Sequence, residues 1–346
     1  MVSPARARQA LGAVAGIASM AGSVTDRAEA LVEPLRQITP FDAVFLTLFD
    51  PERRLQVPVL RQGYPEPASR GLDGEQFTRD VELAGMHGPS GPVRAGDLPV
   101  PVETLPTWSQ YLYPAGFREG LAISLFSADG RYLGVLNTSS ADPRPASDAA
   151  CAVLAQMAPF VASAVDPMRS VSAVADLVAG AAAGVVLTRA GGAVPLPGLP
   201  GHRLLAPGSA LLAAAHSRLT GDSVQTSFLC PADGDTEPSW LLVRALRCPS
   251  QPPWYLSTAV LLCPPPDLRG LTRRELEVLG LLIEGWSNAR IADGLSLSLR
   301  TVVTHMEHIM TKFDAASRTM AAIRASRQGL YVPPELSLTA APDVER

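Results

Sequence analysis

The sequence predicts a multidomain protein in which an α+β region precedes a small all-α domain. With 346 residues, the chain is long enough for two or three domains. Before Pro264, helical patterns alternate with runs of β-forming residues, and Ser127-Ala128-Asp129-Gly130 is a strong hairpin turn. From Leu271 to Leu330, short helical patterns follow one another, and each opens with Ser or Thr.

Composition indicates globular domains and gives no signal for a bound metal. Charged residues make up 18%, hydrophobic residues 47%, and the mean hydropathy is +0.15. The net charge of −4 does not indicate nucleic-acid binding by the whole chain, so charge has to be considered by segment. The cysteines are Cys151, Cys230, Cys248 and Cys263, and no two of them have C-x-x-C spacing. We therefore expect reduced thiols that are mostly in the core, and neither a metal site nor a cofactor.

Two apolar stretches are expected to be packed helices rather than membrane segments. Residues 9–22 are mostly Ala and Gly, unlike the core of a signal peptide. Residues 171–187 are interrupted by Asp176 and are shorter than the roughly 20 residues of a spanning helix. We therefore expect a cytoplasmic protein without a membrane partner.

The first predicted domain, residues 23–166, follows an N-terminal helical segment, residues 1–22. A helical stripe covers Thr25 to Ile38, and β-forming runs cover Phe41 to Phe49 and Leu55 to Leu60. Residues 63–106 are crowded with Gly and Pro and are expected to be mostly loop. The hairpin strands span 121–126 and 131–138, and a helix covers 146–165. This order predicts an antiparallel sheet with flanking helices.

The hairpin sequence carries a resemblance. Tyr113 to Leu136, YPAGFREGLAISLFSADGRYLGVL, resembles the signature hairpin of GAF domains, which are small sensory modules. The resemblance implies a small ligand of unknown identity between the sheet and the variable loops. The candidate lining residues are Trp108, Tyr111, Tyr113 and Phe117. The alternative is that these rings fill a closed core.

The middle region, residues 167–263, resembles a PAS-like sensory domain. Helical patterns at 170–183 and 209–219 accompany β-like runs at 184–189, 240–246 and 255–262. A packing spacer is the alternative. Residues 264–270 begin with three prolines, which favour a stiff extended linker before the last domain.

The last domain, residues 271–332, has the signals of a helix-turn-helix. Thr272 and Glu275 form a capping box for the first helix. Ser287 opens a very short helix, and Ser298 opens a longer one after a tight turn. In such an arrangement the longer helix can enter the major groove of DNA. Residues 333–346 are expected to be a flexible tail.

This stretch resembles the LuxR-type four-helix DNA-binding domain. The matching positions include Leu271-Thr272-x-Arg274-Glu275, Gly285-x-Ser287-Asn288, Thr301-Val302-x-x-His305 and Lys312-Phe313. The resemblance implies double-stranded DNA as a partner and a homodimer formed through the fourth helix. Charge agrees, because residues 268–332 contain nine basic and six acidic residues and are therefore about +3 within an acidic chain.

Candidate DNA contacts follow from the longer helix and its surroundings. We expect base-edge contacts from Thr301, Val303, Thr304 and Glu307. Phosphate contacts are expected from Arg290, Ser298, Arg300, His305, Lys312 and Arg318. Related domains usually carry basic residues at the positions of Val303 and often of Glu307, so the operator preference of relatives is not carried over.

The sequence therefore predicts a bacterial transcription regulator. Its helix-turn-helix would be gated by the N-terminal sensory domains, through a small ligand or a dimer rearrangement. The alternative is a regulator of protein partners whose helix-turn-helix has lost DNA binding. No nucleophile–base constellation or phosphate loop is visible, so we do not expect an enzyme.

Overall fold

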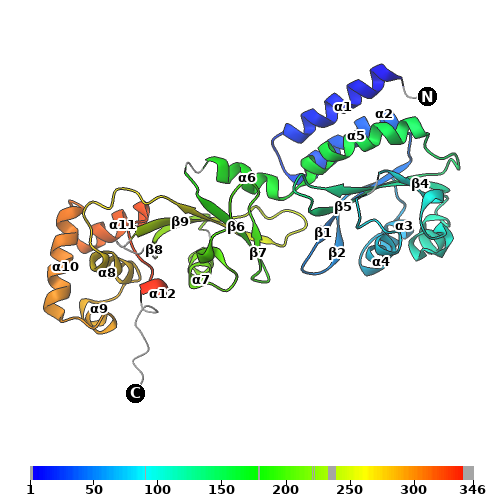
Figure 1. Cartoon of the computed structure of the whole chain (residues 1–346). Helices are drawn as coiled ribbons and strands as arrows, with labels where there is room; N and C mark the ends of the chain where they lie inside the picture. The colour runs from blue at the N-terminus through cyan, green and yellow to red at the C-terminus, as the bar shows by residue number, and fades with distance from the viewer. Residues whose placement is uncertain are drawn as a thin grey trace. The chain divides into compact units, whose positions relative to one another are not determined.

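The computed structural model describes residues 3–89, 91–177, 180–219, 221, 223–232 and 239–337. The chain forms two compact units (Figure 1). Unit 1 contains residues 1–170 with 250–255, and unit 2 contains residues 171–249 with 256–346. The observed division falls after residue 170, whereas the sequence placed a boundary after residue 166. The middle and helical domains, expected to be separated by a proline-rich linker, belong to the same unit.

Unit 1 is built on an antiparallel sheet of five strands in the order β2-β1-β5-β4-β3. The strands are β1 (Ala43–Asp50), β2 (Leu55–Gln62), β3 (Val93–Arg94), β4 (Glu119–Phe126) and β5 (Tyr132–Ser140). Leu46 of β1 lies opposite Leu60 of β2 and Leu136 of β5. Because side chains alternate along a strand, Leu46 and Phe45 lie on opposite faces and enter separate core clusters.

Helices α2 (Val24–Ile38) and α5 (Asp148–Val165) lie on one face of this sheet, and α1 (Pro4–Ser19) packs on the outside of both (Figure 1). Their buried stripes join Leu46 in one core cluster. The Ser23 side chain and Asp26 form a capping box that starts α2. Among the described residues, α5 is long and apolar enough to cross a membrane, which by itself is weak evidence.

Short helices cover the other face: α3 (Glu66–Gly71), α4 (Glu75–Leu83) and the helical turns η1 (Ala95–Asp97), η2 (Val102–Thr104) and η3 (Thr107–Leu112). The prediction that residues 63–106 are mostly loop is therefore wrong. Pro67 lies in the first turn of α3, where a missing N–H costs nothing, and Gly74 starts α4 with a φ of 91°. These residues begin helices here rather than interrupt them.

The middle part of unit 2 repeats the topology of the first sheet. Its five strands are ordered β7-β6-β10-β9-β8, the same order relative to the sequence. The strands are β6 (Ala183–Thr188), β7 (Ala193–Pro195), β8 (Gln225–Ala232), β9 (Ser239–Arg247) and β10 (Leu256–Cys263). Helices α6 (Met168–Leu177) and α7 (Ala210–Ser217) and the turn η4 (Arg203–Leu205) accompany them. The sequence pattern did not indicate β8, an edge strand that tolerates Pro231.

The helical part of unit 2 contains α8 (Arg273–Ile283), α9 (Asn288–Gly294), α10 (Leu299–Lys312), α11 (Arg318–Gln328) and α12 (Pro334–Ser337). The Thr272 and Glu275 capping box is present, and Ser287, Ser298 and Ser317 each cap the following helix. An α+β region followed by an all-α helix-turn-helix domain confirms the predicted fold class.

The segment after α11 ties the helical domain to the middle sheet. The Leu229 N–H of β8 donates to the Tyr331 carbonyl at 2.8 Å, and the Val332 N–H donates to the Leu276 carbonyl of α8 at 3.1 Å. Arg218, at the end of α7, forms ion pairs with Glu284 at 2.8 Å and Glu335 at 2.9 Å. Residues 333–337 of the expected tail thus include α12, and residues 338–346 lie outside the described part.

Candidate functional site

Helix α10 presents a row of exposed side chains opposite its buried face. Val302, Met306 and Ile309 are buried at helical spacing and hold α10 against the domain core. Val303, one residue after Val302, is 40% exposed. The full exposed row is Arg300, Val303, Thr304, Glu307 and Thr311. This row includes four of the predicted DNA contacts on one helix face.

The turn before α10 is fixed by hydrogen bonds. The Leu297 N–H donates to the Ala292 carbonyl of α9 at 2.8 Å, and Ser296 adopts a φ of 54°. The Ser298 Oγ accepts the Thr301 N–H at 3.1 Å and lies 2.8 Å from the Thr301 hydroxyl. Ser298 and Thr301 therefore position the start of α10.

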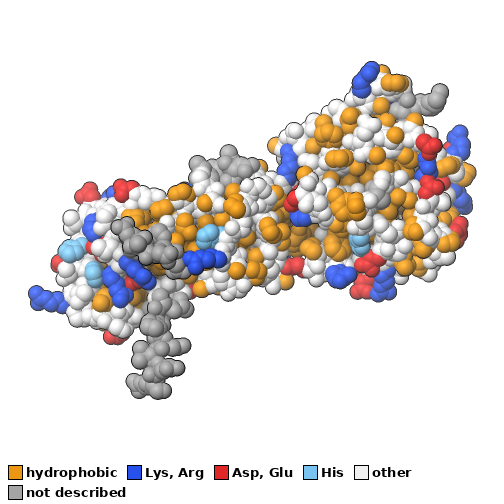
Figure 2. All heavy atoms as spheres, viewed as in Figure 1, with side chains coloured by type: hydrophobic (Ala, Val, Ile, Leu, Met, Phe, Trp, Pro, Cys, Tyr) orange, Lys and Arg blue, Asp and Glu red, His pale blue; other side chains and the backbone are white. Residues whose placement is uncertain are grey.

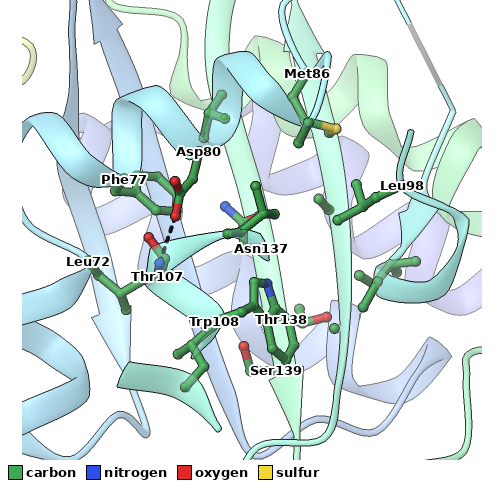
Figure 3. A pocket seen from close by; sticks show the side chains of 18 of the residues that line it. Leu72, Phe77, Asp80, Met86, Leu98, Thr107, Trp108, Asn137, Thr138 and Ser139 are labelled. Atoms are coloured by element: carbon green, nitrogen blue, oxygen red, sulfur yellow. Dashed lines mark hydrogen bonds between the residues drawn. The ribbon is translucent and has the colours of Figure 1, made fainter. Parts of the chain in front are cut away.

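Unit 1 contains a cavity of about 70 Å³ on the α4 side of its sheet. Figure 3 shows its side chains, with Trp108 across the space from Asp80 and Asn137. A Cβ at Gly120 would lie 2.6 Å from the Trp108 ring, so a glycine on β4 lets the ring approach the strand closely. The cavity walls come from α4, η3, β4 and β5.

Of the four aromatic residues predicted to line a ligand site, only Trp108 is in the lining of this cavity. A Cβ at Gly71 would lie 2.1 Å from the Tyr111 ring, so Tyr111 packs on α3. Tyr113 packs against Trp108 with ring centroids 5.4 Å apart. Phe117 is 5% exposed and packs against Tyr64, which matches the alternative of a ring that fills a core.

Asp80, Thr107 and Asn137 line the cavity but were not among the predicted residues. Asp80 lies in the segment that was expected to be loop, Thr107 follows that segment directly, and Asn137 begins the polar end of β5. Their proximity depends on the tertiary fold, and no local pattern indicates it. In the described part of the chain, no group of three or more His, Cys, Asp or Glu residues is arranged to hold a metal ion.

Two parts of the chain match family models. Residues 269–325 match the model of bacterial regulatory proteins of the luxR family, and residues 23–165 match the GAF domain. The protein joins a GAF domain to a luxR-family regulatory domain. This confirms the two resemblances stated from the sequence.

Similarity to curated proteins is confined to a short stretch. A 60-residue segment, 17% of this chain, is 45% identical to the transcriptional regulatory protein LiaR of Bacillus subtilis and covers 28% of it. The response regulator protein VraR of Staphylococcus aureus is 40% identical over 60 residues, which are 17% of this chain and 29% of VraR. The chain therefore matches less than a third of the length of either protein.

Similarity to solved structures is more distant. Escherichia coli SdiA aligns over 91% of this chain and 94% of its own, with a TM-score of 0.33 and 16% identity. The GAF domain of a phosphoenolpyruvate-protein phosphotransferase from Coxiella burnetii covers 49% of this chain and 99% of its own, with a TM-score of 0.37 and 17% identity.

Several basic side chains of the luxR domain form ion pairs or hydrogen bonds within the domain. Arg273 and Arg274 both pair with the buried carboxylate of Glu277, at 3.0 and 2.7 Å. Arg324 donates to the Phe313 and Asp314 carbonyls, both at 2.6 Å, just beyond the end of α10. Figure 2 shows basic and acidic side chains mixed on the visible face of the luxR domain, without one basic patch.

Among the predicted phosphate contacts, Lys312 and Arg318 have partners within the domain. Lys312 Nζ donates to the Gly270 carbonyl and to Glu275 Oε2, both at 2.7 Å. Arg318 donates to the Trp286 carbonyl at 2.8 Å, which ties α11 to the loop before α9. Arg290 stacks on Trp286, with its guanidinium carbon 3.9 Å from the ring centroid.

The remaining two predicted phosphate contacts on α10 are Arg300 and His305. Arg300 is exposed and makes no ion pair with the residues that the structure describes. His305 is half-buried. Within the described part of the chain, the guanidinium groups of Arg290 and Arg300 therefore differ from the Lys312 and Arg318 side chains in having no hydrogen bond or ion pair to another residue.

The Glu275–Lys312 pair gives the luxR domain a pH-dependent stability. Burial alone would raise the pKa of Glu275, but hydrogen bonds from Lys312 and Thr272 outweigh burial and hold this pKa below its ordinary value of 4.5. A carboxyl whose pKa is lower in the folded state stabilises the fold above the unfolded pKa. This stabilisation is lost as the pH falls through the folded pKa.

We expect Lys312→Met to lower the free energy of unfolding at pH 7 by about 2 kcal/mol, because it leaves the Glu275 carboxylate without its charged donor. The difference from wild type should shrink as the pH falls through the folded pKa of Glu275, which Lys312 and Thr272 hold below the ordinary glutamate value. Urea unfolding followed by circular dichroism between pH 7 and 3 measures both effects. Arg300→Met on the same helix is the control, and an equal loss in both variants would refute the role of the pair.

Proposed function

We propose that this protein is a DNA-binding transcription regulator whose α10 enters the major groove. The proposal depends on one observation, the exposed row on α10. The opposite face of this helix is apolar and buried, and Ser298 caps its N-terminus. The name of LiaR, a transcriptional regulatory protein, supports the same function.

In this proposal the contacts divide by chemistry. The methyl groups of Val303 suit a thymine methyl, and the Glu307 carboxylate can accept from a cytosine amino group. The Thr304 hydroxyl donates to the Arg300 carbonyl at 3.2 Å. Thr304 can therefore contact a base through its methyl group or accept a hydrogen bond from it through its hydroxyl oxygen. Arg300 and Arg290 are assigned to phosphates, while Lys312 and Arg318 support the geometry of the domain.

We infer that two copies bind DNA together through α11. Met320 and Ile323 are each 43% exposed and lie three residues apart on that helix, so they form one apolar strip. Burying such a strip against a second copy is favourable. Ile323→Glu is therefore expected to shift the protein toward monomer in sedimentation velocity at micromolar concentration. Ile323→Leu is the control, and an unchanged sedimentation coefficient for Ile323→Glu would exclude this surface.

The GAF domain is proposed to be the sensor, with a small molecule in its cavity that alters the DNA-binding activity of the cytoplasmic protein. A ligand shifts such an equilibrium only by its difference in affinity between two states. The cavity beside Trp108 supports this role, because its walls combine apolar and polar side chains.

Selection from a pool of random duplexes tests the proposal. Purified full-length protein at low salt should enrich a defined sequence, and binding should weaken as salt rises. The second candidate, a regulator of protein partners, is favoured by the exposure of two apolar residues on α10, Leu299 at 54% and Val303 at 40%. Absence of any enriched duplex, with or without cell extract, would favour the second candidate.

A further inference from the structure

The polar atoms of the GAF cavity restrict the chemistry of its ligand. The Thr107 hydroxyl oxygen and the Asn137 amide nitrogen are both fully buried and have no hydrogen-bond partner in the described structure. Thr107 itself is only 2% exposed. A buried polar group without a partner costs about 1–3 kcal/mol, and native proteins satisfy nearly all such groups. Two of them around one cavity indicate that the cavity is built for a polar molecule.

Asp80 adds a negative acceptor to the same cavity. Its carboxylate accepts the Thr107 N–H at 2.7 Å and the Gln76 side-chain amide at 2.9 Å, and the residue is 4% exposed. Figure 3 shows Asp80, Thr107 and Asn137 around one space, with the bond between Asp80 and Thr107 dashed. Each carboxylate oxygen can accept a further bond, so this end of the cavity favours a donor and disfavours an anion.

The rest of the lining and the size of the cavity set the other limits. Leu72, Phe77, Val81 and Leu98 form apolar walls. Since a cavity of about 150 Å³ holds benzene, the cavity of about 70 Å³ admits only a few non-hydrogen atoms without movement of its walls.

We propose that this cavity binds a small uncharged molecule with an amide-like edge, in which an N–H donor lies beside a carbonyl acceptor. The carbonyl oxygen accepts from the Asn137 amide, and the N–H donates to the Thr107 hydroxyl or to Asp80. A carboxamide or a small lactam has this edge, and its hydrocarbon part meets the apolar walls. The inference rests on the proposed sensory role of the GAF domain and names the class of molecule sensed.

Three probes of nearly equal shape separate the effects of the donor, the acceptor and the charge of the ligand on binding. Acetamide has both the donor and the acceptor, acetone lacks the donor, and acetate carries a negative charge. Saturation-transfer NMR titrations of the full-length protein should show saturable binding of acetamide, with at least about tenfold weaker binding of acetone and acetate. Equal binding of acetamide and acetone, or no saturable binding of acetamide, would overturn the inference.

Two variants keep the test independent of folding defects. Asn137→Leu should abolish the preference for acetamide and raise the melting temperature of the free protein, because it removes a buried donor without a partner. Thr107→Val should weaken acetamide binding and keep the shape of the wall. Acetamide binding that is unchanged in both variants would contradict the assigned contacts.

The same preparation should be titrated with the duplex obtained by selection. If it binds that duplex but shows no preference for acetamide, the ligand class is wrong and the proposed DNA-binding function stands. If acetamide binds as expected and no duplex is ever enriched, the ligand class stands and the DNA-binding function fails.

Discussion

Replacing Gly280 by alanine is expected to lower the free energy of unfolding of unit 2 by about 3 kcal/mol. A Cβ at this position would lie 1.8 Å from the Val332 carbonyl oxygen, far inside any real contact. The neighbouring atom belongs to the backbone, which is held by the Val332 N–H bond to Leu276 and by the Tyr331 bond to Leu229. The new methyl group must therefore displace the segment that joins α8 to the middle sheet.

Urea unfolding followed by circular dichroism measures this loss, and hydrogen exchange of residues 329–335 should show that the segment opens more often. Gly16→Ala in α1 is the matched control, because a Cβ there meets nothing within 4 Å. It should leave stability unchanged or raise it by up to about 1 kcal/mol through helix propensity. A Gly280→Ala variant as stable as wild type would mean that Val332 does not lie on α8.

The second large effect is expected on the exposed row of α10. Val303→Asp should weaken binding to the selected duplex by at least about 100-fold, or about 2.7 kcal/mol. The new carboxylate lies one helical turn from Glu307, so two negative charges would face the phosphate backbone. Because Val303 is exposed, its replacement should leave the stability of the luxR domain nearly unchanged.

Fluorescence anisotropy with a labelled duplex measures the affinity of this variant. Val303→Thr keeps the shape of the side chain and should stay within about threefold of wild type, which is a free-energy difference below about 0.7 kcal/mol. Ser163→Asp adds the same charge to an exposed position of α5 and controls for the change in net charge. Similar losses for Val303→Asp and Ser163→Asp would show that α10 does not approach the DNA.

Local rules explain why the helical domain could be predicted so fully. A capping hydroxyl at Thr272, Ser287, Ser298 or Ser317 depends only on residues within one turn. The buried stripe of α10 follows from its periodicity alone. The exposed row is the complement of that stripe, so four of the predicted base and phosphate contacts were placed on one face from sequence.

Tertiary contacts explain what could not be predicted. The partner of Lys312 is Glu275, 37 residues earlier, and no pattern in α10 distinguishes this lysine from one that meets phosphate. The cavity depends on Asp80, Thr107 and Asn137, which come from three separate elements. Likewise, the Tyr331 carbonyl pairs with β8, a strand that sequence periodicity did not indicate.

The salt dependence of binding to the selected duplex tests the central claim most directly. If α10 binds in the groove, the logarithm of the association constant should fall linearly with the logarithm of the salt concentration. Arg300→Gln should make this slope shallower by about 1 for each protomer, because one phosphate contact is lost. A slope that is flat, or that Arg300→Gln leaves unchanged while it weakens binding, would contradict the placement of α10 on DNA.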